Sequence, residues 1–188
     1  LFFMCDVSHG AIHQVAFYTS LVNFVLSLLL WIQFDKLTSY FQHTHKLGWL
    51  PFANVDVHIG IDGISLFFIL LTTFLTPICI IISRNSVKAY IKEYMICFLL
   101  LELMLILVFC VLDLVLFYIF FESILMPMML IIGVWGSRER KIGAAYQFFL
   151  YTLFGSVFFL LAILAVYFET GTTDVHILLT TQFPFHRQ

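Results

Sequence analysis

The chain has 188 residues, of which 62% are hydrophobic and only 11% are charged, and its net charge is -2. An average soluble domain carries roughly 25% charged residues, and a single core could not bury this much apolar surface, so the composition excludes a water-soluble fold. The nine Lys and Arg residues fall in short connecting segments rather than in a basic stripe, which excludes nucleic acid as a partner.

Five apolar segments follow one another along the chain. A helix with a rise of about 1.5 Å per residue needs about 20 residues to cross a hydrocarbon core of about 30 Å, and each segment is long enough. We therefore predict an all-α fold, a polytopic transmembrane helix bundle that forms a single membrane domain over residues 1–188. The predicted spanning helices cover residues 15–34, 61–83, 93–112, 114–135 and 143–168.

The connections between these helices predict the orientation of the bundle, because Lys and Arg are retained on the cytoplasmic or matrix side of a membrane. Loops 84–92 and 136–142 each carry three cations, whereas the turn at Asp113 has none. The longer first connection has only Lys36 and Lys46, and we interpret it as a modestly polar loop with a turn near residues 48–51. Loops 84–92 and 136–142 are thus predicted to face the matrix or cytoplasm.

The histidines and cysteines give no redox or metal signature. All seven histidines are predicted to lie outside the spans, or at the margin of one in the case of His13, whereas a b-type haem needs histidines on facing helices within the membrane. His43 and His45 are interpreted as solvated loop residues. The four cysteines are scattered, and three lie in apolar runs where Cys behaves as a small hydrophobe, so we predict neither a disulfide framework nor a metal site.

In the second predicted helix, three threonines precede Pro77. Hydroxyl groups in that position usually satisfy a backbone that proline has opened, so we assign Thr72, Thr73 and Thr76 a structural role. Glu102 lies near the middle of the third helix among apolar neighbours. It is a candidate second proton relay, and the alternative is a protonated acid bonded to another helix.

Glu122 is the main candidate, because it lies deep within the fourth predicted helix. An acidic residue at the bilayer centre costs about 2.5–3.5 kcal/mol, so it normally faces a bundle interior or a file of water and has a function. Burial disfavours the charged form of a carboxyl group, which suits it to load and release a proton. Pro127 leaves the carbonyl of Ser123 without its usual partner, so the helix can kink and admit water beside Glu122. The alternative is a neutral, hydrogen-bonded structural acid.

The fifth predicted helix carries a stripe of polar and small residues. Gln147, Tyr151 and Gly155 are spaced four residues apart, with Thr152 and Ser156 beside them. The stripe is typical of close helix packing with interhelical hydrogen bonds, which we favour over a proton path.

Several long motifs occur in one order between Gly60 and Thr173, and together they resemble the chain 4 family of the mitochondrial proton-pumping NADH:ubiquinone oxidoreductases, or respiratory complex I. The motifs are GIDGIS at residues 60–65, FYIFFE at 117–122 with Pro127 and Met128, WGSRERK at 135–141, AYQFF at 145–149 and YTLFGS at 151–156.

The resemblance implies an antiporter-like subunit in the membrane arm of the complex, in the mitochondrial inner membrane, with other membrane-arm subunits as partners. NADH, FMN, iron–sulfur clusters and ubiquinone would lie elsewhere in the complex, and no cofactor is implied on this chain. In that family the acid of the FFE motif is a proton-channel residue that works with lysines on later helices, and here it falls on Glu122.

The chain departs from the family pattern at both ends. The first family helix is largely absent, and the chain stops at residues 186–188, before the broken helix that should carry the central lysine. We therefore expect a split subunit, in which a second polypeptide supplies the missing helices. Two alternatives remain open at this point: a structural subunit that does not pump, and part of a free-standing cation/proton antiporter.

Overall fold

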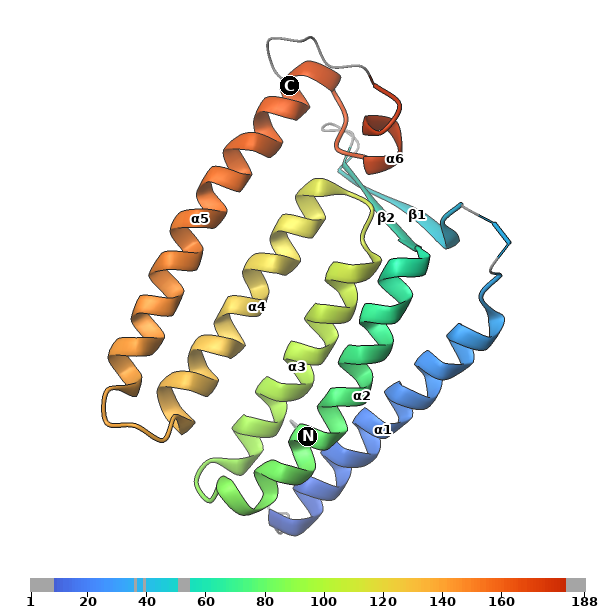
Figure 1. The fold of residues 1–188 in the computed structure, drawn as a ribbon. Coiled ribbons are helices and arrows are strands. Elements are labelled where there is room, and N and C mark those ends of the chain that lie inside the picture. Colours follow the sequence, from blue (N-terminus) through green and yellow to red (C-terminus); the bar gives the residue numbers. More distant parts are fainter. Residues whose placement is uncertain (1–8, 36, 39, 51–54, 182–188) are drawn as a thin grey trace.

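The computed structural model describes residues 9–35, 37–38, 40–50 and 55–181. Five long helices lie side by side in chain order, and each is long and apolar enough to cross a membrane (Figure 1). This confirms the predicted fold class and the five spans. The helices are α1 (His9–Gln33), α2 (Gly63–Ser86), α3 (Ile91–Cys110), α4 (Leu114–Trp135) and α5 (Lys141–Thr170), and a short α6 (Val175–Leu178) follows.

The main difference from the predicted spans is that α1 begins at His9 rather than at Val15. The extra turns form because Ile12 and Ala16 are buried in a hydrophobic cluster with residues of α2 and α3, including Ile80 and Met95. His13, predicted at the margin of a span, thus lies within the first two turns of α1.

The long first connection forms an antiparallel hairpin of β1 (Gln42–Leu50) and β2 (Val55–Ile61), which the sequence analysis did not predict. Lys46 pairs with His58, and Gly48, which we had placed in a turn, pairs with Asp56. Strand pairing of this kind depends on residues far apart in the sequence, so local composition does not reveal it. The end of the predicted turn, Pro51, lies outside the described residues.

The two ends of the bundle differ in charge. We call the end that carries β1 and β2 the hairpin end, and the opposite end, with the connections 87–90 and 136–140, the basic end (Figure 1). Both cation-rich loops lie at the basic end, as expected if both face the same side of a membrane. The cations at or near this end are Arg84, Lys88, Lys92, Arg138, Arg140 and Lys141.

Polar contacts join the segments at the hairpin end. Asp113 accepts hydrogen bonds from the first backbone N–H groups of α4 and another from the hydroxyl of Thr173. Asp174 accepts from Lys46 Nζ at 2.7 Å, and its Oδ2 lies 3.1 Å from His58 Nδ1. The hairpin, the turn before α4 and the segment after α5 are therefore fixed to one another.

Candidate functional site

Glu122 lies on α4, eight residues from its first residue, Leu114, which is about 12 Å along the axis. The side chain is half-buried, and its buried Oε2 atom has no hydrogen-bond partner among the described residues. The helix continues without a break through Pro127. Glu122 is thus an acid within a membrane-length helix, with one oxygen left for a partner that the described residues do not supply.

A groove opens between α4 and α5 on the hairpin side of Glu122. Its volume is about 370 Å³, and its walls are mainly aromatic, with two hydroxyl-bearing side chains. Phe121, the neighbour of Glu122, is one of its walls. The lining residues are Phe117, Phe121, Thr152, Gly155, Ser156 and Phe159.

Glu102 on α3 is far more enclosed, with only 1% of its surface exposed. Neither carboxyl oxygen has a hydrogen bond of ordinary geometry among the described residues, although the side chain of Asn23 on α1 interacts with the carboxyl group. The sequence left open a protonated acid bonded to another helix. The structure identifies Asn23 as the neighbour on that helix.

The two glutamates lie at one depth in the bundle. Glu102 is eight residues from Cys110 at the end of α3, and Glu122 is eight residues from Leu114 at the start of α4, so each is about 12 Å from the hairpin end of its helix. Helices α3 and α4 pack against each other. The structure therefore brings the two candidate relays to one level on neighbouring helices, but it does not join them by a hydrogen bond.

The threonines of α2 bond within their own helix and make one further contact. Thr72, Thr73 and Thr76 each donate a hydrogen bond to the carbonyl four residues earlier, and these acceptors do not include the Thr73 carbonyl that Pro77 leaves without its usual partner. The Thr73 hydroxyl also lies 2.8 Å from the hydroxyl of Ser27 on α1, in a buried contact. The sequence analysis missed this link, because it depends on how α1 packs against α2.

Part of the polar stripe on α5 faces the bundle, and part of it is exposed. Ser156 is buried and Thr152 is half-buried, whereas Gln147 and Gly155 are exposed and Tyr151 is 76% exposed. A Cβ atom added to Gly155 would meet nothing within 4 Å. The stripe is predicted to mediate close packing, but among the described residues Gln147 and Tyr151 have no helix packed against them, and Gly155 lines the open groove beside α4.

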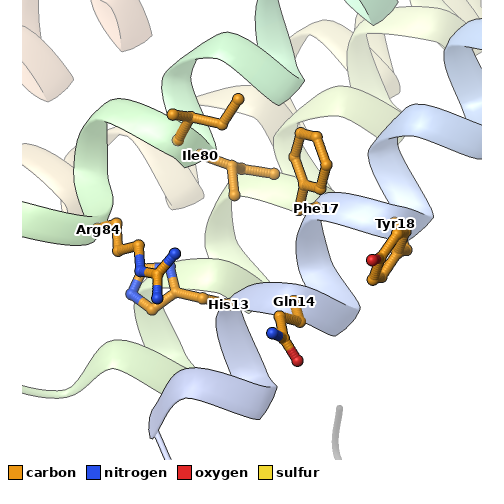
Figure 2. Close-up of a pocket in the computed structure, with 7 residues that line it drawn as sticks. His13, Gln14, Phe17, Tyr18, Ile80 and Arg84 are labelled. Carbon is orange, nitrogen blue, oxygen red and sulfur yellow. The ribbon is translucent and has the colours of Figure 1, made fainter.

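Two histidines are buried that the sequence analysis had placed in or near loops. His13 lies inside α1, where it lines a cavity of about 200 Å³ with Arg84 and Phe17 at the basic end (Figure 2). His58 is buried on β2 beside Asp174. In the part of the chain that the structure describes, no three His, Cys, Asp or Glu side chains are grouped closely enough to hold a metal ion.

Comparison with known proteins gives one consistent relationship. The family described as NADH:quinone oxidoreductase/Mrp antiporter, TM matches residues 111–187, which include α4 and α5. The chain is 61% identical to NADH-ubiquinone oxidoreductase chain 4 of Marchantia polymorpha and 60% identical to that of Arabidopsis thaliana, in each case over 94% of this chain and 36% of the relative. The chain 4 of Prototheca wickerhamii is 52% identical over 100% of this chain and 39% of its own length.

A solved structure has the same arrangement of helices. A chain of respiratory complex I from Thermus thermophilus with bound NADH superposes with a TM-score of 0.82 at 25% identity, over 93% of this chain and 36% of that chain. This chain therefore spans little more than a third of the length of the relatives it matches.

Proposed function

The chain is homologous to NADH-ubiquinone oxidoreductase chain 4 over about a third of the length of that protein, and from this premise we propose that it is part of a core membrane-arm subunit of a proton-pumping NADH:ubiquinone oxidoreductase. Within that subunit it contributes the glutamate half of an antiporter-like proton channel. Glu122 is the reversible proton carrier.

The proposal rests on the depth of Glu122 in α4 and on the missing hydrogen bond of its Oε2 atom. Placing an acid this deep in a spanning helix costs about 2.5–3.5 kcal/mol, and a purely structural acid would offset that cost with hydrogen bonds. The buried Oε2 atom of Glu122 has none from the described residues. An oxygen without a partner is available to water or to a cationic side chain from outside these residues, as a proton-transfer group requires.

The exposed polar face of α5 is a second reason to propose that further helices pack against this chain. Gln147 and Tyr151 project from a span with no described helix against them, and polar groups at membrane depth normally face protein or water rather than lipid. Helices that correspond to the rest of the relatives' length would cover this face, on a second polypeptide or on the same one. They would also bring the cationic partner of Glu122, while other membrane-arm subunits surround the assembly.

The location follows from the same premise. We place the chain in the mitochondrial inner membrane as a multi-pass protein, because its relatives are named as NADH-ubiquinone oxidoreductase subunits and its five helices have membrane length. The basic end then faces the matrix, since positive charge is retained on that side. NADH, FMN, iron–sulfur clusters and ubiquinone belong to other parts of the complex, and their redox energy would reach this chain as a change in the electrostatic surroundings of Glu122.

The test compares Glu122→Gln with Glu139→Gln in sealed membranes that contain the assembled complex. Glutamine keeps the shape of the side chain but cannot carry a proton, whereas Glu139 is an exposed acid in the loop at the basic end. We expect Glu122→Gln to slow proton transfer, and with it NADH-driven pumping by the coupled complex, by about a hundredfold, the lower end of the range known for the loss of a proton-transfer group. Glu139→Gln should pump normally. Normal pumping by an assembled Glu122→Gln complex would leave the chain as a structural subunit.

A further inference from the structure

The face of α1 that packs against α2 and α3 carries polar side chains over most of its length. His13, Ser20, Asn23 and Ser27 recur at the spacing of one helix face, and Ser20 is completely buried. An apolar span needs no such series, because lipid and neighbouring helices would accept apolar side chains at each position. The hydroxyls of Ser20 and Ser27 donate to the carbonyls of Phe17 and Phe24 in their own helix, and each hydroxyl oxygen can still accept a hydrogen bond from water.

Helix α2 adds hydroxyl groups at matching depths. Thr73 meets Ser27, and Thr76 is buried one turn closer to the basic end. Because Ser27 and Thr73 are in contact, Asn23, which precedes Ser27 by four residues, lies about one turn closer to the basic end, near the level of Thr76. A column of hydroxyl and amide groups thus runs between the two helices.

The column meets Glu102 at its inner end. Glu102 lies about 12 Å below the hairpin end of α3, and its carboxyl group interacts with Asn23. The carboxyl group is almost wholly buried, and neither oxygen has a hydrogen-bond partner of ordinary geometry among the described residues. Such an acid can hold its proton or exchange it with water that enters the column.

The other end of the column faces the cavity at the basic end. This cavity of about 200 Å³ is open to the surroundings, and His13 and Arg84 line it from α1 and α2 (Figure 2). His13 is ten residues from Asn23, so the cavity lies about 15 Å from the level of Glu102. Between the cavity and Ser20 lies about one turn lined by Ala16 and Met95, both completely buried. Water from the cavity has to cross this short apolar turn to enter the column, so entry is intermittent rather than continuous.

We propose that Glu102 is a second proton-binding site, reached by water from the basic end through the hydroxyl- and amide-lined column between α1, α2 and α3. A proton passes from water in the cavity along the column to a carboxylate oxygen of Glu102, and returns to water when the carboxyl group is again deprotonated. The inference rests on the proposed function of the chain in proton translocation, but it concerns a path separate from Glu122.

The first experiment asks whether the column admits water, without reference to pumping. Ser20→Cys and Val22→Cys are placed in the assembled complex and treated with a water-soluble, charged thiol reagent, and the modified residue is located by peptide mass, which separates it from the native cysteines. Val22 is 54% exposed on the outer side of α1 and serves as the matched control. Thiol reagents attack the thiolate, which needs water, so we expect labelling at position 20 to be about tenfold faster than at position 22.

Equal, slow labelling at the two positions would overturn the water path. Thr76→Cys repeats the test from α2 in case the change at Ser20 prevents assembly.

The second experiment measures protons moved per NADH oxidised in Glu102→Gln, Asn23→Leu and Glu122→Gln. A several-fold loss in the first two variants supports the proposal. Normal pumping in Glu102→Gln together with a large loss in Glu122→Gln would overturn the role of Glu102 and leave the proposed function of the chain intact.

Discussion

The two halves of the bundle differ in where they place their polar residues. In the half formed by α1, α2 and α3, a series of polar side chains is buried between the helices, where Ser27 meets Thr73 and Glu102 is enclosed, although Gln14 and Thr19 on α1 are exposed. In the half formed by α4 and α5, Glu122 is only half-buried, and Gln147 and Tyr151 point outward. The first half is closed within the chain, whereas the second is open toward something outside the described residues.

The difference teaches how far the chain can act by itself. A closed half can hold a buried acid and a path to it without further helices. An open half needs additional protein before its acid has a partner and its polar groups are covered, because polar groups at membrane depth are costly in lipid. This is why we place the completion of the proton channel on the side of α5.

The largest effect on assembly is expected from a substitution at Gly155. In the described part of the chain a Cβ atom added at this position meets nothing within 4 Å, and the groove that Gly155 lines has room for a side chain, so Gly155→Leu should leave the five helices intact. If other helices cover this face closely, the same change should abolish assembly of the chain into the complex, because small residues allow close helix approach. The measurement is the amount of the chain in the assembled complex on a native gel.

The matched control for Gly155→Leu is Val157→Leu, which enlarges an exposed apolar side chain on a different side of α5. It should assemble normally. Full assembly of Gly155→Leu would contradict the view that the open face is covered by protein.

A smaller effect is expected in the closed half. Met95 is completely buried between α1, α2 and α3, so Met95→Ala should leave a cavity and lower the free energy of unfolding by about 2–5 kcal/mol. Leu103→Ala on the same helix removes a side chain that is 53% exposed and should cost much less. The measurement is the detergent concentration at which each variant of the chain is lost from the complex. Similar losses from both variants would show that the closed half is not a packed core.

The smallest effect concerns the contacts that fix the hairpin end. Partial burial by itself raises the pKa of Asp174, but hydrogen bonds from Lys46 and the backbone of His176, together with the positive charge of Lys46 and the nearby His58, outweigh it and hold this pKa below its ordinary value. Because the pKa is lowered by folding, the contribution to stability is present above the unfolded value of about 3.9 and is lost as the pH falls through the folded pKa.

The contribution of Asp174 should be below about 1 kcal/mol, since Lys46 is half-exposed and solvent screens the pair. The protection of amides in β1 and β2, measured as exchange relative to the intrinsic rate at each pH, should therefore fall slightly below about pH 4, the range in which this carboxylate takes up a proton. Asp174→Asn should exchange faster at neutral pH and lack this acid-dependent step. An unchanged acid response in Asp174→Asn would assign it to other groups.

The features that the sequence predicted correctly are those that depend on local composition, because long apolar runs reveal the five spans. An acid inside such a run also points to Glu122 and Glu102, and their role as proton carriers stays a prediction. The features it missed depend on packing between distant segments. The pairing of Lys46 with His58 creates the hairpin, and the contact of Asn23 with Glu102 connects α1 to α3.

The polar stripe on α5 is a second feature that depends on packing and not on local sequence alone. Its spacing correctly indicates a common face, but spacing alone does not tell whether that face is packed within the chain or left open. In the structure Gln147, Tyr151 and Gly155 are exposed. The stripe is therefore better explained by packing against helices outside the described residues than by packing within the chain.

The central claim is that Glu122 gains and loses a proton while the complex works. Infrared difference spectra of the assembled complex, recorded before and after addition of NADH, report this directly through the carboxyl C=O stretch of a protonated glutamic acid. The account predicts a carboxyl band that changes on addition of NADH in the native complex, shifts in Glu122→Asp and is missing in Glu122→Gln. The same carboxyl difference bands in Glu122→Gln and the native complex would contradict it.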